Sequence, residues 1–179
     1  TTSPSMDILI SSNLERLIYR IAGNNAAKNA ELMASLKSEG KYKITDDMKA
    51  QLADFYGNYA TEAEDAATIK KIYEDCGYVI DTHTSVAATV YDKYRKETGD
   101  TTKTVIASTA SPYKFSGSVL AAIGKDTNAD EFGLVDELAE VSKIPVPASL
   151  AALKDKEVRF TKVIDKADMK DYIYSALGI

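Results

Sequence analysis

The chain has 179 residues, 45% of them hydrophobic, which is enough for one sizeable core, so we expect a single domain spanning residues 1–179. The formal net charge is −5, and basic residues are interspersed with acidic ones, which excludes a basic surface for nucleic acid. No apolar run is long enough to cross a membrane, and we expect no membrane partner.

Cysteine and histidine are too few for several kinds of site. The single cysteine, Cys76, cannot form a disulfide within the chain, which indicates a reducing compartment, and we expect a cytoplasmic protein. Cys76 has no histidine or second cysteine near it, so we expect a buried, inert thiol. His83 is the only histidine, and no carboxylates have ligand spacing, so we expect no metal site.

Helical spacing of apolar residues dominates the chain. Glycines follow several of these stretches, as expected just beyond helix ends. The sequence Thr61-Glu62-Ala63-Glu64 predicts a cap with glutamate at the third helical position. In chain order, the predicted helices span residues 6–22, 26–39, 46–55 and 61–76, then a helix that follows residue 84 and ends near Gly99, and then residues 112–123, 130–142, 148–153 and 165–177.

Short apolar runs between the helices predict strands. These runs are residues 78–80, 104–107 and 158–163, and residues 41–44 are expected to be a short extended piece. The run 104–107 leads into a polar cluster and then Pro112. The predicted fold class is therefore α/β, helix-rich with a few mostly parallel strands. Because ligands bind at the carboxyl ends of parallel strands, residues 81–84 and 108–111 are expected to face one crevice.

Residues 108–111 have two other interpretations. They could form an ordinary capped turn between a strand and a helix. A triad of Ser108, His83 and Asp81 can also be written, but Asp81 and His83 are too close in sequence for the usual arrangement. The chain also has no Gly-x-Ser-x-Gly turn, so the sequence disfavours a triad.

Residues 108–115, STASPYKF, closely resemble a signature of the threonine synthase family. Residues 3–16, SPSMDILISSNLER, and residues 77–87, GYVIDTHTSVA, match two further stretches of that family in the same order. The resemblance is strong up to about Gly124 and weaker beyond it. It implies that the chain is similar to part of the large domain of a type II, tryptophan-synthase-like pyridoxal-phosphate enzyme.

The resemblance also implies a reaction, in which O-phosphohomoserine and water give L-threonine and phosphate. In this family the Schiff-base lysine and a glycine-rich phosphate loop lie upstream of these motifs. None of the nine glycines here lies within two residues of another, and no lysine has an apolar, glycine-flanked setting. We therefore expect a C-terminal portion that lacks its N-terminal partner and is inactive alone.

The family resemblance assigns site residues as well. Thr109 matches the hydroxyl that meets the pyridine nitrogen of the cofactor, with Ser108 beside it. Other residues in matched motifs are expected to line the same cavity: Ser12, Asn13, Arg16, His83 and Lys114.

Two of these residues have open alternatives. Arg16 suits an anionic phosphate, but an ion pair with Glu15 or Glu31 is equally expected. The family has proline where this chain has Thr82, so we expect a less rigid turn around His83. The alternative to a role of His83 in the cavity is that of a hydrogen-bond donor that only supports the fold. A rival function from another class is a non-catalytic α/β ligand-binding or regulatory module, and the upstream sequence would decide between the two.

Overall fold

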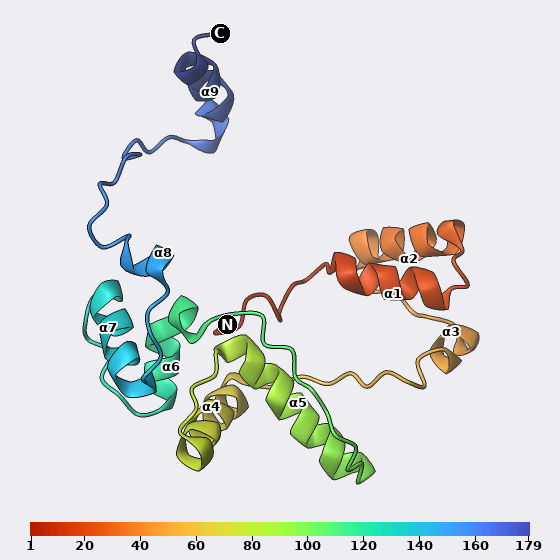
Figure 1. The fold of residues 1–179 in the computed structure, drawn as a ribbon. Coiled ribbons are helices and arrows are strands. Elements are labelled where there is room, and N and C mark those ends of the chain that lie inside the picture. Colours follow the sequence, from red (N-terminus) through yellow and green to blue (C-terminus); the bar gives the residue numbers. More distant parts are fainter. The chain divides into compact units, whose positions relative to one another are not determined.

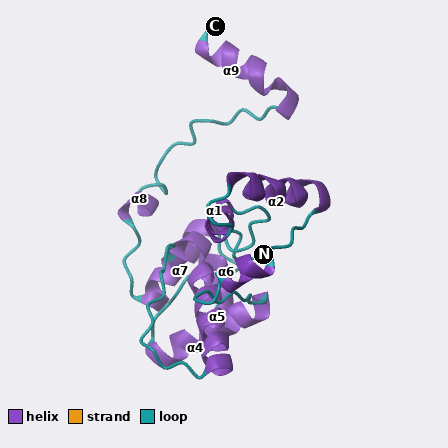
Figure 2. Ribbon diagram, turned by 90° about the vertical axis from the view of Figure 1, so that its right-hand side faces the viewer, coloured by secondary structure: helices purple, strands orange, loops and turns teal.

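The structure, a computed structural model, describes residues 1–179, and all of its regular elements are helices (Figures 1 and 2). The chain divides into two compact units, Thr1–Ile144 and Pro145–Ile179. The helices are α1 (Ser12–Ile21), α2 (Ala26–Glu39), α3 (Asp46–Ala50), α4 (Glu62–Cys76), α5 (Thr82–Thr98), α6 (Ser116–Ala122), α7 (Glu131–Ser142), α8 (Ala148–Ala151) and α9 (Met169–Leu177), with 3₁₀ turns η1 (Pro112–Phe115) and η2 (Lys166–Asp168).

The three predicted strands and the predicted extended piece at residues 41–44 form no strand in the structure. None of the four segments 41–44, 78–80, 104–107 and 158–163 forms a strand. A strand needs a hydrogen-bonded neighbour, and these segments find none within the chain. Val105 is 90% exposed although the sequence placed it in a buried strand, whereas Val79 is buried. The predicted parallel sheet, and with it the α/β class, is therefore not confirmed by this chain.

Helices α1 to α3 share a small hydrophobic core. Its buried members are Ile18, Ile21, Leu32 and Met48. The sequence predicted that the first helix begins at residue 6, but α1 begins at Ser12, because the Ser11 side chain accepts a hydrogen bond from the Leu14 amide and caps the helix there. Helix α2 spans the predicted residues 26–39.

Helices α4 to α7 form the part of the fold that carries most of the polar site described below. Helix α4 contacts both α5 and α6, and α6 also packs against α7. Thr61 and Glu64 form the predicted capping box at the start of α4. Gly77 and Gly99 end α4 and α5 in the left-handed conformation predicted for glycines at helix ends. The most deeply buried apolar side chains here are Ile69, Val79, Val119, Leu120 and Leu138.

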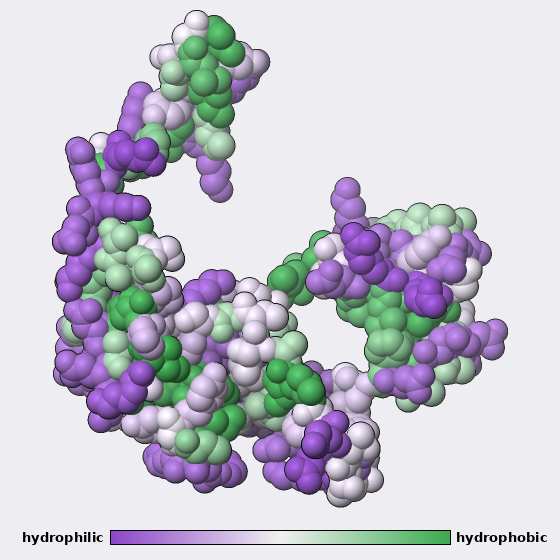
Figure 3. Space-filling model, in the orientation of Figure 1, coloured by the Kyte–Doolittle hydropathy of each residue, from purple (hydrophilic) through white to green (hydrophobic).

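The second unit, Pro145–Ile179, has no buried side chain. Apolar side chains gather on α9 and are exposed, among them Met169, Ile173 and Leu177 (Figure 3). The apolar residues of the second unit therefore do not enter a core. The single domain spanning residues 1–179 stays a prediction.

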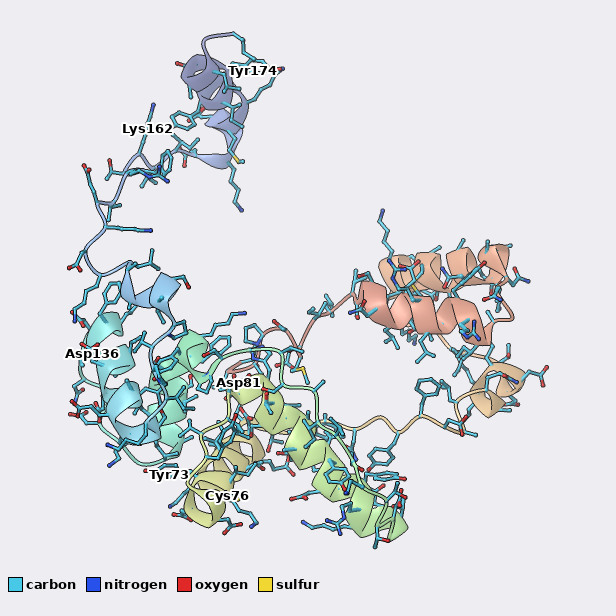
Figure 4. The ribbon with its side chains drawn as sticks, in the orientation of Figure 1. Tyr73, Cys76, Asp81, Asp136, Lys162 and Tyr174 are labelled. Carbon is cyan, nitrogen blue, oxygen red and sulfur yellow. The ribbon has the colours of Figure 1, made fainter.

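Cys76 is exposed, so the prediction of a buried thiol is wrong. It is the last residue of α4 and lies at the end of that helix, where little packs over it (Figure 4). The cytoplasmic location inferred from a single cysteine stays a prediction. None of the helices combines the length and the apolar character that a membrane crossing requires.

We expect Leu120→Ala to destabilise the chain by about 2–5 kcal/mol, because Leu120 is fully buried and its truncation leaves a cavity. The matched control is Leu9→Ala, because Leu9 is 91% exposed and its truncation should change stability by less than about 0.5 kcal/mol. Urea unfolding of both variants checks this. An equal loss of stability in the two variants would contradict the burial of Leu120 in α6.

Candidate functional site at the start of α5

The first turn of α5 is buried although its residues are polar. Asp81, Thr82, His83, Thr84 and Ser85 all lie below 9% exposure. Such burial requires hydrogen-bond partners, because an unpaired polar group in the interior is costly. The contacts of this turn therefore define which groups of the chain belong to one site.

Asp81 lies at the start of α5 (Figure 4). Its side chain caps this helix and is fully buried. One carboxylate oxygen accepts the amide N–H groups of His83, at 2.8 Å, and of Thr84, at 3.2 Å. The other carboxylate oxygen accepts the hydroxyl of Thr84. A carboxylate also suits this position because the partial positive charge of the helix N-terminus stabilises it.

Residues 2–5 fasten the other side of the turn. The Thr82 hydroxyl donates to the backbone oxygen of Thr2 at 2.8 Å, and the Ser5 amide donates to Nε2 of His83 at 3.1 Å. Proline at position 82 could not make the first of these bonds. The less rigid turn predicted from the loss of proline is therefore offset by a hydrogen bond that only the threonine supplies.

These bonds also fix the tautomer of His83. Nε2 accepts from Ser5, so the proton of the neutral ring is on Nδ1. Nδ1 faces the Thr82 hydroxyl oxygen at 3.3 Å and Oδ1 of Asp81 at 3.5 Å, and both can accept that proton. Both ring nitrogens are thus occupied by groups of the chain itself, which supports the structural role considered for His83.

The motif at residues 108–115 meets this turn at two points. The hydroxyl oxygens of Ser108 and Thr84 lie 2.8 Å apart. The rings of Phe115 and His83 lie 4.9 Å apart at a tilt of 36°, and Nζ of Lys114 lies 5.3 Å from the Phe115 ring centroid. Two segments that are separate in sequence, residues 81–85 and 108–115, therefore form one site without a sheet beneath them.

Ser108 and Thr109 are exposed at the edge of this site, whereas Thr84 is buried. The exposed Thr109 hydroxyl makes no hydrogen bond within the chain. The Ser108–His83–Asp81 triad is not formed, because Ser108 bonds to Thr84 and Nε2 of His83 is taken by the Ser5 amide.

Three predicted cavity residues lie elsewhere, in the first turns of α1. Ser12, Asn13 and Arg16 are exposed, and no hydrogen bond or ion pair joins them to α5. The ion pairs considered for Arg16 are not present, because Glu15 accepts from Asn29 and Glu31 pairs with Lys28. A role for these three side chains in the cavity stays a prediction.

Sequence reasoning missed the central position of Asp81 and Thr84. Aspartate is a favoured N-cap residue, and its place directly before a stretch with helical spacing is the signal that could have identified the cap. Sequence reasoning also gave no role to Asp65, which reaches the same region from α4. No sequence pattern predicts the contact of Asp65 with Thr2, because the two residues are 63 positions apart.

Asp65 is buried and only partly hydrogen-bonded. Oδ2 accepts from the Thr2 hydroxyl at 3.1 Å, while Oδ1 has no partner. Burial raises the pKa of the Asp65 carboxyl above its ordinary value, the hydroxyl groups of Ser85 and Thr2 oppose the shift, and the nearby charge of Asp81 adds a smaller increase. The structure contains no group of three or more His, Cys, Asp or Glu side chains placed to hold a metal ion.

Comparison with known proteins places this chain in one family. The family model "Threonine synthase, C-terminal" matches residues 84–173. The human protein "Threonine synthase-like 1" is 36% identical over 124 residues, which cover 69% of this chain and 16% of the human protein.

Two solved structures are similar in fold. A threonine synthase from Brucella melitensis with bound pyridoxal phosphate is 33% identical, with a TM-score of 0.63 over 80% of this chain and 29% of its own. Threonine synthase from yeast is 29% identical, with a TM-score of 0.75 over 99% of this chain and 36% of its own.

The helical fold, the matched residues and these similarities define the chain as a relative of pyridoxal-phosphate threonine synthases. The chain belongs to the threonine synthase C-terminal family. It spans less than a third of the length of the curated relatives it matches.

We expect Asp65 to make the stability of the chain depend on pH. A carboxyl whose pKa is raised in the folded state holds its proton more tightly there than in the unfolded chain, so stability is lost as pH rises from the ordinary pKa through the raised pKa. Asp65→Asn removes this titration, and its amide oxygen can still accept from Thr2. Urea unfolding between pH 4 and pH 7 should show wild type losing stability relative to the variant as pH rises. A difference that is constant over this range would contradict the raised pKa.

Proposed function

We propose that this chain is part of a threonine synthase, in which the complete protein converts O-phosphohomoserine and water into L-threonine and phosphate. The chain would belong to the large domain of a type II pyridoxal-phosphate enzyme, and the lysine and phosphate loop for the cofactor would lie in an N-terminal portion that these 179 residues do not contain. The observation that carries the proposal is the meeting of two matched motifs, through the Thr84–Ser108 contact of 2.8 Å.

The residues present fit one part of the cofactor site. When bound, pyridoxal phosphate supplies an electron-accepting ring, and the partner of its pyridine nitrogen sets how strongly that ring accepts electrons. A hydroxyl partner leaves this nitrogen essentially unprotonated, whereas a carboxylate would hold a proton on it. Thr109 offers an exposed hydroxyl that has no other hydrogen bond, so it is the residue we assign to the nitrogen.

The other residues would serve as supports. Asp81 and Thr84 would hold the 108–109 segment in place, and the tilted ring contact between His83 and Phe115 would orient the end of η1, from which Lys114 extends into solvent. Lys114 and Arg16 are both exposed cations and could hold the phosphate of the substrate. None of these side chains supplies a cradle for the cofactor phosphate, which agrees with an inactive isolated chain.

The test is an assay of the complete protein, expressed from the gene with its upstream sequence, for threonine and phosphate formed from O-phosphohomoserine. We expect activity that depends on pyridoxal phosphate in the complete protein and none in the 179-residue chain. A complete protein that binds a small molecule at this site without converting O-phosphohomoserine would instead be the non-catalytic binding module.

We expect Thr109→Val in the complete protein to weaken cofactor binding by about 1–3 kcal/mol, because the change preserves shape and removes one hydrogen bond. Thr127→Val is the control, since Thr127 is exposed and lies outside the matched motifs. Fluorescence titration with pyridoxal phosphate measures both. Unchanged affinity in Thr109→Val would refute the assignment of this hydroxyl.

A further inference from the structure

A chain of hydrogen bonds runs from a fully buried carboxylate to an exposed hydroxyl. It links Asp81, Thr84 and Ser108, with Thr84 in the middle. Each of the two hydroxyl groups has one proton to donate, so the direction of one bond decides the direction of the next.

The direction is set at Asp81. Its first carboxylate oxygen accepts two amide N–H groups, and its second oxygen accepts the Thr84 hydroxyl, so both oxygens of Asp81 act as acceptors. Thr84 therefore gives its only hydroxyl proton to Asp81. The contact between Thr84 and Ser108 must then use the proton of Ser108, because Thr84 has none left to give.

We propose that Asp81 acts through Thr84 as a positioning residue, turning the Ser108 proton inward so that Ser108 presents only acceptor lone pairs to a ligand. This inference rests on the proposed function and deepens it. A ligand group that contacts Ser108 must be a hydrogen-bond donor, and the task of donating to an unprotonated ring nitrogen is left to Thr109 alone. Asp81 and Thr84 touch no ligand, and they determine what Ser108 can recognise.

The first experiment tests the chain of hydrogen bonds without any cofactor. Unfolding of the 179-residue chain is compared for wild type, Thr84→Val, Ser108→Ala and the double variant. We expect Ser108→Ala to change the unfolding equilibrium roughly 2- to 10-fold in wild type and not at all in Thr84→Val. Independent, additive effects would overturn the proposed link between Thr84 and Ser108.

The second experiment uses Asp81→Asn to test the direction of the hydrogen bonds from Ser108 through Thr84 to Asp81. Asparagine caps helices about as well as aspartate, but its amide N–H would replace the oxygen that accepts from Thr84. In this variant Thr84 would accept from the introduced side-chain amide and donate to Ser108, whose own proton would turn outward. Asp130→Asn is the matched control, because Asp130 caps α7 through the Gly133 amide and contacts no such hydroxyl.

The readout is the dissociation constant for pyridoxal phosphate in the complete protein. We expect Asp81→Asn to weaken binding roughly 2- to 10-fold when Ser108 is present and to have no effect in a Ser108→Ala background, with Asp130→Asn unchanged in both. An equal loss in both backgrounds would mean that Asp81 acts only as a cap, and would overturn the proposal. A wild-type complete protein that binds no pyridoxal phosphate would refute the proposed function. The unfolding comparison, which needs no cofactor, would still test whether Thr84 and Ser108 are linked by a hydrogen bond.

Discussion

The candidate site depends on one buried carboxylate, that of Asp81. Asp81 follows residues 78–80, caps α5 and receives the hydroxyl of Thr84. Because Asp81 is fully buried, a loss of any of its partners would leave an uncompensated polar group in the interior. The bonds from His83 and Thr84 therefore fix the start of α5 in one arrangement. Residues 2–5 and 108–115 then contact this fixed turn.

The chain has segments whose chemistry suits a sheet, but no sheet forms within it. Thr104–Ala107 and Val158–Val163 are rich in β-branched residues and lie largely exposed, with no neighbouring strand. The relatives are more than three times as long as the part this chain matches in them.

Much of the helical fold could be predicted from the sequence, because helix signals are local. Thr61 and Glu64 are three residues apart, and their capping box fixes the start of α4 where it was expected. Strands could not be predicted reliably, because pairing depends on residues far away or absent. The early start predicted for α1 failed for a local reason: apolar residues 8–10 continue the helical spacing, but Ser11 provides the cap.

The site was predictable only in part. The motif residues Ser108 and His83 were identified, and the structure brings both to the start of α5. The contacts that hold them there join residues that are separated by 24 and by 78 positions in the sequence. The periodicity of apolar residues cannot predict contacts between residues so far apart. Thr82 gives a second example. The presence of threonine in place of proline predicted a looser turn, because the sequence does not show that the Thr82 hydroxyl bonds to the distant residue Thr2.

The most direct test of this account is the hydroxyl proton of Thr84, observed by NMR in the 179-residue chain. A hydroxyl that is buried and donates to a carboxylate exchanges slowly with water, so we predict a resolved signal with a nuclear Overhauser contact to the amide of His83. That signal should disappear in Asp81→Ala. A Thr84 hydroxyl that exchanges too fast to observe in wild type would contradict the claim that Asp81 holds the start of α5 and directs the site.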